Sequence, residues 1–543
     1  MRKRTSAIIL FFTVFCVVIL SGCFQAAQEP TFDLIIKDGL VYDGTTDKPR
    51  VTDIGIKGDK ISAIGKFSCQ ATKIIDARGF IVTPGFIDVH SRTDFILKGK
   101  GIWRFMAYIK PAINGNHNYL YQGVTSIITG NDGNGYTNTA KWLNWVDSLK
   151  FGVNVYHLAP VGAICDELFS GKEPQPLDEN QRHTLKKRVL KEMENGAIGL
   201  SFDLSRNPDQ LLDKEALTDI AGSINHYGGV VSMILRNSTG ALDSAGNPAF
   251  VNSLKEVTEI SRRAQTPLEI SCLRLKTPWK NLNYEQISSI IRDARQAGID
   301  VTADQTPYDY GFDILTSFLP PEYVANYEIK KEYTTAEGKN TVIKAVNRLF
   351  TTTAPENFSI ISYPANKSYE GKNIRQIATF ERKSTAQCYW EMASNGSPPI
   401  VAVPDSSGHF AKLVMRSPIV FTASEGISYV KDSAIPHPSY WGAFARKIRK
   451  YALEDKIVNL NDAIRSMTAL PAEKFKLAGR GKITVGSFAD IAIINIDTFR
   501  DKASFLHPEQ YAEGVEYLIV NGILSIDRGK ITGKKGGKAL KRI

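Results

Sequence analysis

The chain has 543 residues, more than a single hydrophobic core usually supports, so we expect one large domain of about 250–400 residues with smaller additions. Hydrophobic residues make up 43% of the chain and charged residues 23%, which is ordinary for a globular protein and excludes a largely disordered one. The formal net charge is +11 at pH 7, and basic residues are concentrated at both ends of the chain.

The first residues have the pattern of an export signal. Basic residues at positions 2–4 precede an apolar run over 7–20, which ends in the sequence Leu-Ser-Gly-Cys at 20–23. A basic start, an apolar core of this length and small residues at its end are typical of a secretory signal rather than of a membrane-spanning helix. The ending resembles a bacterial lipobox. We therefore expect a signal peptide over 1–22 and an exported lipoprotein of the cell envelope, anchored to membrane lipid through Cys23. An uncleaved anchor or plain secretion is the alternative.

A short polar tether is expected over 23–31, and a basic tail over 536–543. The tail is expected to rest on anionic lipid or to be solvated. A nucleic-acid partner is not expected for an exported protein. The cysteines form no CxxC pair, so we expect no disulfide framework, although export would permit one or two bridges.

Short strands and turns dominate both ends of the globular part. In the first fragment, 32–80, hairpins are predicted at the turns 37–39 and 57–60. The same pattern returns over 478–535, with an Asn-Gly turn at 521–522. Two fragments with unpaired edges need each other, so we predict one small β-sandwich domain built from both chain ends.

Between these fragments, over 81–477, short apolar strands alternate with helical stretches. The predicted strands lie at 124–128, 152–158, 197–202, 229–234, 268–272, 301–304 and 419–422, and the helices at 180–195, 214–227, 254–264 and 284–297. Repeated units of this spacing predict an α/β fold with a parallel (β/α)8 barrel of the TIM type. The segment at about 327–396 does not fit the repeat, and we expect an insertion that could act as a lid.

One strand brings several polar side chains to the predicted barrel mouth. The apolar residues 80–82 and 86–87 flank a Pro-Gly break, and His90, Arg92 and Asp94 follow at a spacing of two. Residues two apart point to the same side of a strand, so these side chains are expected to leave its carboxyl end together. Barrels of this kind carry their chemistry at that end.

Several segments together resemble the amidohydrolase superfamily, and among its members the N-acyl-D-amino-acid deacylases, or D-aminoacylases. They are 32–39, 84–90, 122–125, 196–201, 301–305 with 307–308, 437–438 with 441–442, 467–472 and 486–490. The resemblance covers nearly all of 32–542. It implies hydrolysis of a non-peptide C–N bond in an N-acyl amino acid, with barrel-bound zinc polarising the carbonyl and activating water.

This chain departs from the family pattern where the metal ligands belong. By the resemblance, His90 is kept, but Arg92 stands in place of the second histidine of a His-x-His pair. Asp132 replaces a metal-binding cysteine, while Ile234 and Cys272 replace histidines. A guanidinium has no lone pair to offer and would repel a cation. The zinc site is therefore predicted to be largely lost, leaving either no cofactor or a residual zinc ion on His90, Asp132 and Cys272.

The family's catalytic aspartate after the last barrel strand corresponds to Glu425, which is the candidate catalytic residue. If no metal binds, Arg92 is expected to pair with Asp132 or Glu425 and to take over the charge of the missing cation. Asp304 is expected to act as a hydrogen-bond anchor at its strand end.

Further residues are candidates for substrate binding. Arg236 and Asn237 match the family, in which an arginine at this strand end helps to hold the substrate carboxylate, a task suited to its bidentate geometry. Arg92, His437 and Tyr308 are the other candidates. Two functions remain open. The chain is either a D-aminoacylase-like hydrolase with an altered metal site, or a catalytically inactive lipoprotein that binds a partner or a small ligand such as an N-acyl amino acid. Loss of the ligands favours the second.

Overall fold

The computed structural model describes residues 32–542, apart from 46, 69, 99–100, 170–175, 239–247, 276–283, 321–322, 326–327, 405–408 and 429–435. The predicted signal peptide, the tether and Cys23 lie outside the described residues. Within the described part, no helix is long and apolar enough to cross a membrane. Three cysteines in this part, Cys165, Cys272 and Cys388, are free thiols.

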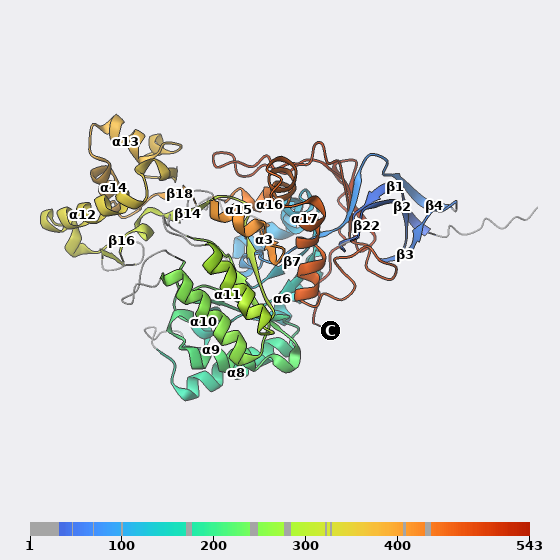
Figure 1. The fold of residues 1–543 in the computed structure, drawn as a ribbon, viewed down its shortest axis with the longest axis horizontal. Helices are drawn as coiled ribbons and strands as arrows, with labels where there is room; N and C mark the ends of the chain where they lie inside the picture. Colours follow the sequence, from blue (N-terminus) through green and yellow to red (C-terminus); the bar gives the residue numbers. More distant parts are fainter. Residues whose placement is uncertain are drawn as a thin grey trace, which may run out of the picture.

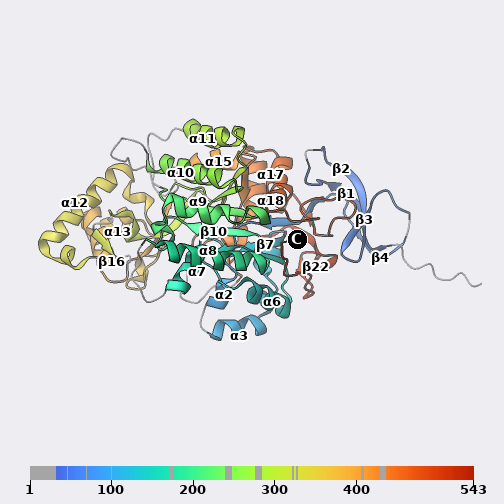
Figure 2. The same cartoon turned by 90° about the horizontal axis from the view of Figure 1, so that it is seen from below.

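One mixed sheet joins the two ends of the chain. Its strands are β1 (Phe32–Val41), β2 (Arg50–Lys57), β3 (Lys60–Gly65), β4 (Ala71–Asp76), β5 (Ile81–Pro84), β20 (Ile491–Ile494), β21 (Val515–Val520), β22 (Ile523–Asp527) and β23 (Lys530–Ile531). Their order is β23-β22-β21-β20-β5-β1-β2-β3, with β4 beside β1. The antiparallel pair β5–β20 therefore links the fragments within one continuous sheet, which lies at one end of the molecule (Figures 1 and 2).

One predicted hairpin in this sheet is wrong and another is confirmed. β1 runs through residues 37–39 without turning back, because Asp38 adopts a left-handed conformation (φ 57°) at a bulge. The Asp53 carboxylate stabilises the bulge by accepting the Asp38 N–H at 3.0 Å. The turn at 57–60 does connect β2 to β3, with Gly58 at φ 60°.

The α/β fold class is confirmed. The parallel strands are β6 (Phe86–Asp88), β7 (Val124–Thr129), β8 (Asn154–His157), β9 (Ala159–Pro160), β10 (Gly199–Asp203), β11 (Val230–Ile234), β12 (Leu268–Ser271), β13 (Val301–Gln305) and β19 (Val420–Thr422). They form two sheets, β6-β7-β8 and β9-β10-β11-β12-β13-β19, rather than the closed ladder expected of a barrel. The break between β8 and β9 falls at Leu158, and a single bridge, Ser91 to Gly426, links the β6 and β19 ends.

Helices pack on the outer face of the longer parallel sheet (Figure 2). They are α7 (Val161–Phe169), α8 (Glu179–Glu194), α9 (Lys214–Gly222), α10 (Ala249–Ala264), α11 (Tyr284–Gln296) and α15 (His409–Met415). Near the other strands lie α2 (Phe95–Lys98), α3 (Gly101–Ile109), α4 (Pro111–Asn114), α5 (His117–Leu120), α6 (Thr139–Leu149), α16 (Ser439–Arg446), α17 (Leu460–Ser466) and α18 (Ala469–Lys474). The sequence indicates where α8 starts, since Asp178 and Gln181 form a capping box there.

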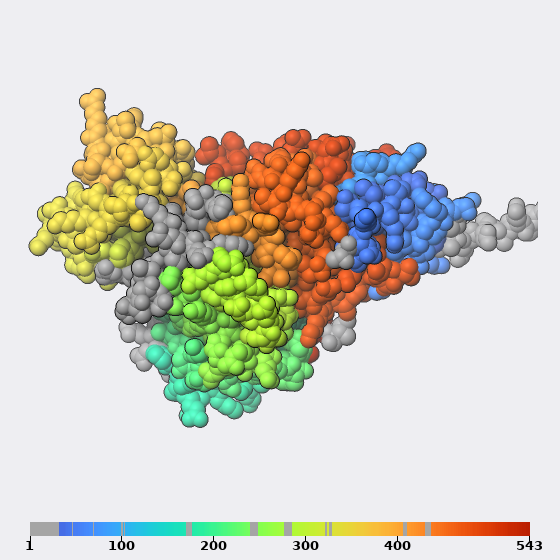
Figure 3. All heavy atoms as spheres, in the orientation of Figure 1, coloured from blue at the N-terminus to red at the C-terminus, as the bar shows by residue number. Residues whose placement is uncertain are grey.

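The insertion is larger than predicted and forms a lobe with its own core. It contains β14 (Tyr310–Ile314), β15 (Val324–Ala325), β16 (Glu328–Ile329), α12 (Ala336–Thr352), β17 (Ser359–Ser362), α13 (Ile374–Glu381), α14 (Thr385–Ala393) and β18 (Ile400–Pro404). The antiparallel pair β14–β18 closes the lobe at its base. The lobe protrudes at the end of the molecule opposite the mixed sheet (Figures 1 and 3).

The predicted basic tail packs against the amino ends of the parallel strands. The N–H of Gly537 donates to the carbonyl of Phe151 at 3.0 Å. The N–H of Val155 donates to the carbonyl of Lys538, and the carbonyl of Val155 accepts the N–H of Leu540. Arg542 stacks on Tyr227, with its guanidinium carbon 4.5 Å from the ring centroid. The backbone of the tail is therefore ordered, while Lys538 and Lys541 are exposed, and contact of the tail with anionic lipid stays a prediction.

Candidate functional site at the barrel mouth

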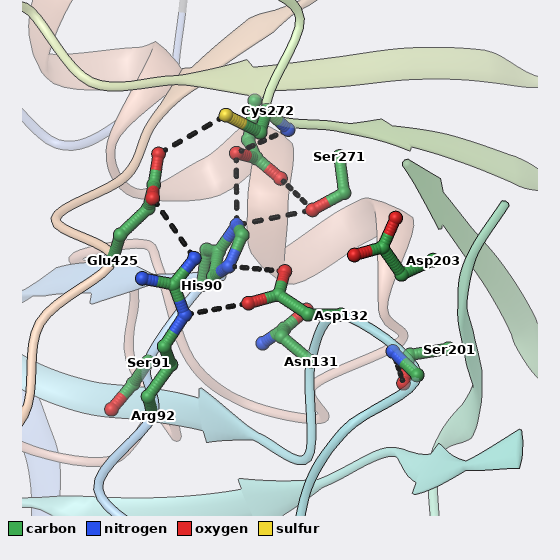
Figure 4. Close-up of polar contacts among 12 residues, drawn as sticks. His90, Ser91, Arg92, Asn131, Asp132, Ser201, Asp203, Ser271, Cys272 and Glu425 are labelled. Carbon is green, nitrogen blue, oxygen red and sulfur yellow. Dashed lines mark hydrogen bonds and ion pairs between the residues drawn. The ribbon is translucent and has the colours of Figure 1, made fainter. Parts of the chain in front are cut away.

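Side chains from the ends of five parallel strands converge on His90 (Figure 4). His90 and Arg92 follow β6, Asp132 follows β7, Cys272 follows β12, Asp304 lies in β13 and Glu425 follows β19. The structure thus brings together the candidate metal ligands, the candidate catalytic residue and one candidate substrate-binding residue.

His90 is fully buried and is held by acidic groups on both ring nitrogens. Its Nε2 lies 2.8 Å from Asp132 Oδ1 and its Nδ1 lies 3.3 Å from Asp304 Oδ1, with Ser271 Oγ 3.0 Å from the same Nδ1. Burial opposes a charge on the ring, but the two carboxylates outweigh it and raise the pKa of His90 well above its usual value. His90 is therefore an imidazolium at neutral pH.

Arg92 lies between two carboxylates. Its Nε donates to Asp132 Oδ2 at 2.5 Å and its Nη2 to Glu425 Oε2 at 3.0 Å. Burial alone would raise the pKa of each carboxyl group, but Arg92 and then His90 offset it. The pKa of Glu425 is lowered to about 2 and that of Asp132 also falls well below its usual range. The predicted pairing of Arg92 is confirmed, and it involves both carboxylates.

Cys272 completes the ring of contacts as a neutral thiol. Its Sγ donates to Glu425 Oε1 at 3.2 Å, and its N–H donates to Asp304 Oδ1 at 3.1 Å. Burial, and then the Glu425 charge, raise the pKa of the thiol well above its usual value. Asp304 also accepts from Ser271 Oγ at 3.1 Å, which confirms that it is a hydrogen-bond anchor.

Three of the converging residues adopt the left-handed conformation. The φ angles are 62° at Asp132, 51° at Cys272 and 53° at Glu425. Such a conformation costs a residue with a side chain about 1 kcal/mol or more, so the surrounding structure must impose it. From these conformations Asp132 contacts His90 and Arg92, while Cys272 and Glu425 contact each other.

The loop that carries Asp132 is held from both sides (Figure 4). Ser201 Oγ donates to the carbonyl of Gly130 at 2.5 Å and accepts the N–H of Gly133 at 3.1 Å. The Asn131 amide donates to the carbonyls of Val89 and Ile128 at 3.1 and 3.0 Å. These contacts fix the carboxylate of Asp132 in the position that His90 and Arg92 require.

The retained side chains do not fit zinc as they are arranged. A zinc ligand must present a lone pair, and the Arg92 guanidinium has none to offer, while Nε2 of His90 lies 2.8 Å from Asp132 Oδ1. Both cations instead occupy the oxygens of Asp132. In the described part of the chain, no three His, Cys, Asp or Glu side chains are placed to hold a metal ion.

Two candidate substrate-binding residues lie elsewhere. Arg236 forms a bidentate ion pair with Glu256 of α10, with distances of 2.9–3.0 Å, and donates to the carbonyl of Leu212. Asn237 donates its N–H to Ser253 Oγ at 3.0 Å. The structure uses Arg236 to join the end of β11 to α10 and does not bring it to the cluster around His90.

His437 and Tyr308 lie where the insertion joins the barrel. The His437 ring packs on Tyr308 and Phe312, with centroids 5.3 and 4.7 Å apart, and its Nδ1 contacts Ser439 Oγ at 2.7 Å. Burial lowers the pKa of His437 to about 3, so the ring is neutral. Tyr308 is buried and donates to Asp501 Oδ2 at 3.1 Å, which indicates a structural role.

A cavity of about 480 Å³ opens beside Arg92 and Asp132. Its lining comprises Arg92, Phe95, Asp132, Gly133, Asn134, Gly162, Ala163, Asp166, Asp203, Arg206, Asn207, Pro208, Asp209, Ile234, Ile427, Pro436 and Tyr440. None of the described residues of the insertion lines it, so the lid remains a prediction. Sequence reasoning missed Ser271, which contacts His90, and Asp209 and Tyr440, which line the cavity, because nothing in their local pattern distinguishes them from other polar residues of strands, loops and helices.

Comparisons with known proteins find similar sequences and similar folds. The family model described as "Amidohydrolase family" matches residues 427–525. An N-acyl-D-glutamate deacylase and a D-aminoacylase, both of Alcaligenes xylosoxydans xylosoxydans, are 27% and 25% identical to it over 91% and 95% of this chain and 94% and 99% of their own lengths.

The fold of the chain matches that of solved D-aminoacylase-type structures. The N-acyl-D-glutamate deacylase of Bordetella bronchiseptica, complexed with zinc and a phosphonate inhibitor, matches with a TM-score of 0.74 and 23% identity over 94% of this chain and 99% of that one. A D-aminoacylase structure matches with a TM-score of 0.74 and 22% identity over 94% of this chain and all of the other.

Proposed function

We propose that this protein binds a small N-acyl amino acid or a related carboxylate at the barrel mouth and does not hydrolyse it through zinc. The observation that carries the proposal is the Arg92 guanidinium between Asp132 and Glu425. Arg92 lines the cavity with a quarter of its side chain exposed, and its remaining N–H groups are suited to a ligand carboxylate.

The protonation states also favour binding over hydrolysis. An efficient general base has a pKa near the working pH. Glu425, with a pKa of about 2, is a poor proton acceptor, and the His90 imidazolium is already protonated. Neither residue is therefore suited to remove a proton from an attacking water.

Hydrolysis of N-acyl-D-amino acids with an altered metal site is the second candidate. It is supported by the similarity of more than nine-tenths of the chain to proteins named as an N-acyl-D-glutamate deacylase and a D-aminoacylase. In that case Glu425 would serve as base and acid, and a residual zinc ion on His90, Asp132 and Cys272 would require Arg92 to move away from Asp132.

Metal analysis and a turnover assay separate the two candidates. Protein purified without chelator is analysed for zinc and then assayed on a panel of N-acyl-D-amino acids with and without added zinc. Binding of panel members in calorimetry, without turnover and without stoichiometric zinc, supports the proposal. Stoichiometric zinc together with turnover overturns it.

We also propose that the protein is exported and held at a membrane by lipid on Cys23. The support is the signal pattern at 1–23. The expected result is that the full chain incorporates a labelled fatty acid and fractionates with membranes in a bacterial host, whereas Cys23→Ala does neither. Incorporation of label into Cys23→Ala at the wild-type level would contradict the proposal.

A further inference from the structure

The cavity extends from Arg92 into a part lined by carboxyl groups, which we call the acidic end and define as Asp166, Asp203 and Asp209. The carboxylate of Asp132 is already compensated by two cations. Among the lining residues that the structure describes, Arg206 is the cation of this part, and its Nε lies 3.4 Å from Asp203 Oδ2. Burial, and then the carboxylates of Asp203 and Asp166, raise the pKa of Asp209 well above its usual value, so this carboxyl group lacks a cation that would favour its charged form.

Asp209 carries an oxygen that no described residue satisfies. The side chain is 2% exposed, and its Oδ2 accepts the N–H of Asp203 at 2.7 Å. Its Oδ1 is buried and has no hydrogen-bond partner within the described part of the chain. A buried polar atom of this kind costs free energy unless a partner is supplied, so Asp209 points to a ligand that provides a donor.

Two glycines connect the acidic end to the cluster around His90. A Cβ on Gly133 would lie 2.1 Å from Asp209 Oδ2, and one on Gly162 would lie 2.9 Å from the same oxygen. The Asp209 carboxyl group therefore fills space that only glycine leaves open. Because Gly133 directly follows Asp132, the acidic end lies next to the cluster around His90, and its three carboxyl groups line the same cavity as Arg92.

We propose that the ligand carries a protonated amine together with its carboxylate, with the carboxylate at Arg92 and the amine in the acidic end. Acylation removes the charge of an α-amine, so the cation of an N-acyl amino acid must come from its side chain. This inference rests on the proposed function and narrows the ligand class to N-acyl amino acids with a cationic side chain.

A matched pair of probes tests the amine. Nα-acetyl-D-lysine and N-acetyl-D-norleucine have the same aliphatic chain, but only the first has the side-chain amine. In calorimetry with the full chain, we expect the lysine compound to bind at least about ten-fold tighter. Asp209→Asn and Asp166→Asn should each reduce this preference to less than about three-fold, while the affinity for the norleucine compound stays within about two-fold.

The control is Asp219→Asn, which removes an exposed carboxylate that pairs with Lys186 away from the cavity, and it should keep the preference. Circular dichroism checks that the Asp209→Asn variant is folded. Asp166→Asn provides a second test, which leaves the buried carboxyl group of Asp209 unaltered. If the unaltered protein binds the two probes equally, the inference that the ligand carries an amine is overturned, but the proposed function is not. If neither probe nor any other N-acyl-D-amino acid binds, both this inference and the proposed function are overturned.

Discussion

The Nε of Arg92 donates to Asp132 Oδ2 at 2.5 Å, while the other oxygen of the same carboxylate lies 2.8 Å from His90 Nε2. One carboxylate thus holds two cations that come from the same strand end. His90 and Asp132 are two of the positions at which the sequence predicts a residual zinc ion. The arrangement explains how the barrel mouth can be ordered by protein charges alone.

Replacing Arg92 should destabilise the fold. Arg92→Met leaves Asp132 and Glu425 facing each other without the guanidinium, and breaking a largely buried ion pair from one side costs about 3 kcal/mol. The measurement is the free energy of unfolding in urea. Arg206→Met serves as the control, because Arg206 is 65% exposed and should change stability little. An unchanged free energy in Arg92→Met would show that the ion pairs do not order the mouth.

The contribution of Glu425 should depend on pH. The folded pKa of Glu425 is about 2, below its ordinary value of 4.5, so its stabilisation is fully present above pH 4.5 and is lost as the pH falls toward 2. The difference in unfolding free energy between the unaltered protein and Glu425→Gln should therefore shrink between pH 4.5 and 2. Glu194→Gln, which alters an exposed position, should show no such trend. A difference that grows on acidification would contradict this prediction.

More of the fold than of the site could be predicted from the sequence. Apolar runs between helical stretches identified most of the parallel strands, since burial on both faces leaves a clear pattern. It did not predict that β1 continues through Asp38, because an Asp-Gly pair suits a bulge as well as a turn. It also did not show where the insertion begins, because β14 resembles any other short strand.

At the site, the sequence predicted the residue identities but not all their partners. The pairing of Arg92 with Asp132 and Glu425 follows from charge and from their positions at strand ends. The roles of Ser271 and Asp209 depend on burial and on contacts between distant segments. The family resemblance predicted that Arg236 binds the substrate carboxylate. Its guanidinium instead pairs with Glu256 of the following helix, α10, and this ion pair determines where it lies.

Removing the Ser271 hydroxyl should loosen His90 without removing a charge. Ser271 Oγ lies 3.0 Å from His90 Nδ1 and donates to Asp304 at 3.1 Å, and it is 1% exposed. Ser271→Ala should cost about 1–3 kcal/mol, because buried acceptors lose a partner. Urea unfolding measures the effect, and the control is Ser289→Ala in α11, whose hydroxyl donates to the carbonyl of Gln286 in the same helix. Equal stability of the two variants would mean that His90 does not depend on Ser271.

Deleting the tail should destabilise the barrel at the amino ends of its strands. Without residues 536–543, Val155 loses the carbonyl of Lys538 and the N–H of Leu540, and Asn521 loses the Gly536 carbonyl that its amide contacts at 2.8 Å. Buried backbone groups left without partners each cost about 1–3 kcal/mol, so the deletion should lower the unfolding free energy by several times the effect of Ser271→Ala. Hydrogen exchange should rise first at Val155, since its N–H is then exposed. A matched variant, Lys541→Ala, removes an exposed charge but keeps these backbone contacts, and it should resemble the unaltered protein. If deletion and Lys541→Ala had the same stability and the same exchange at Val155, the tail would not be part of the folded barrel.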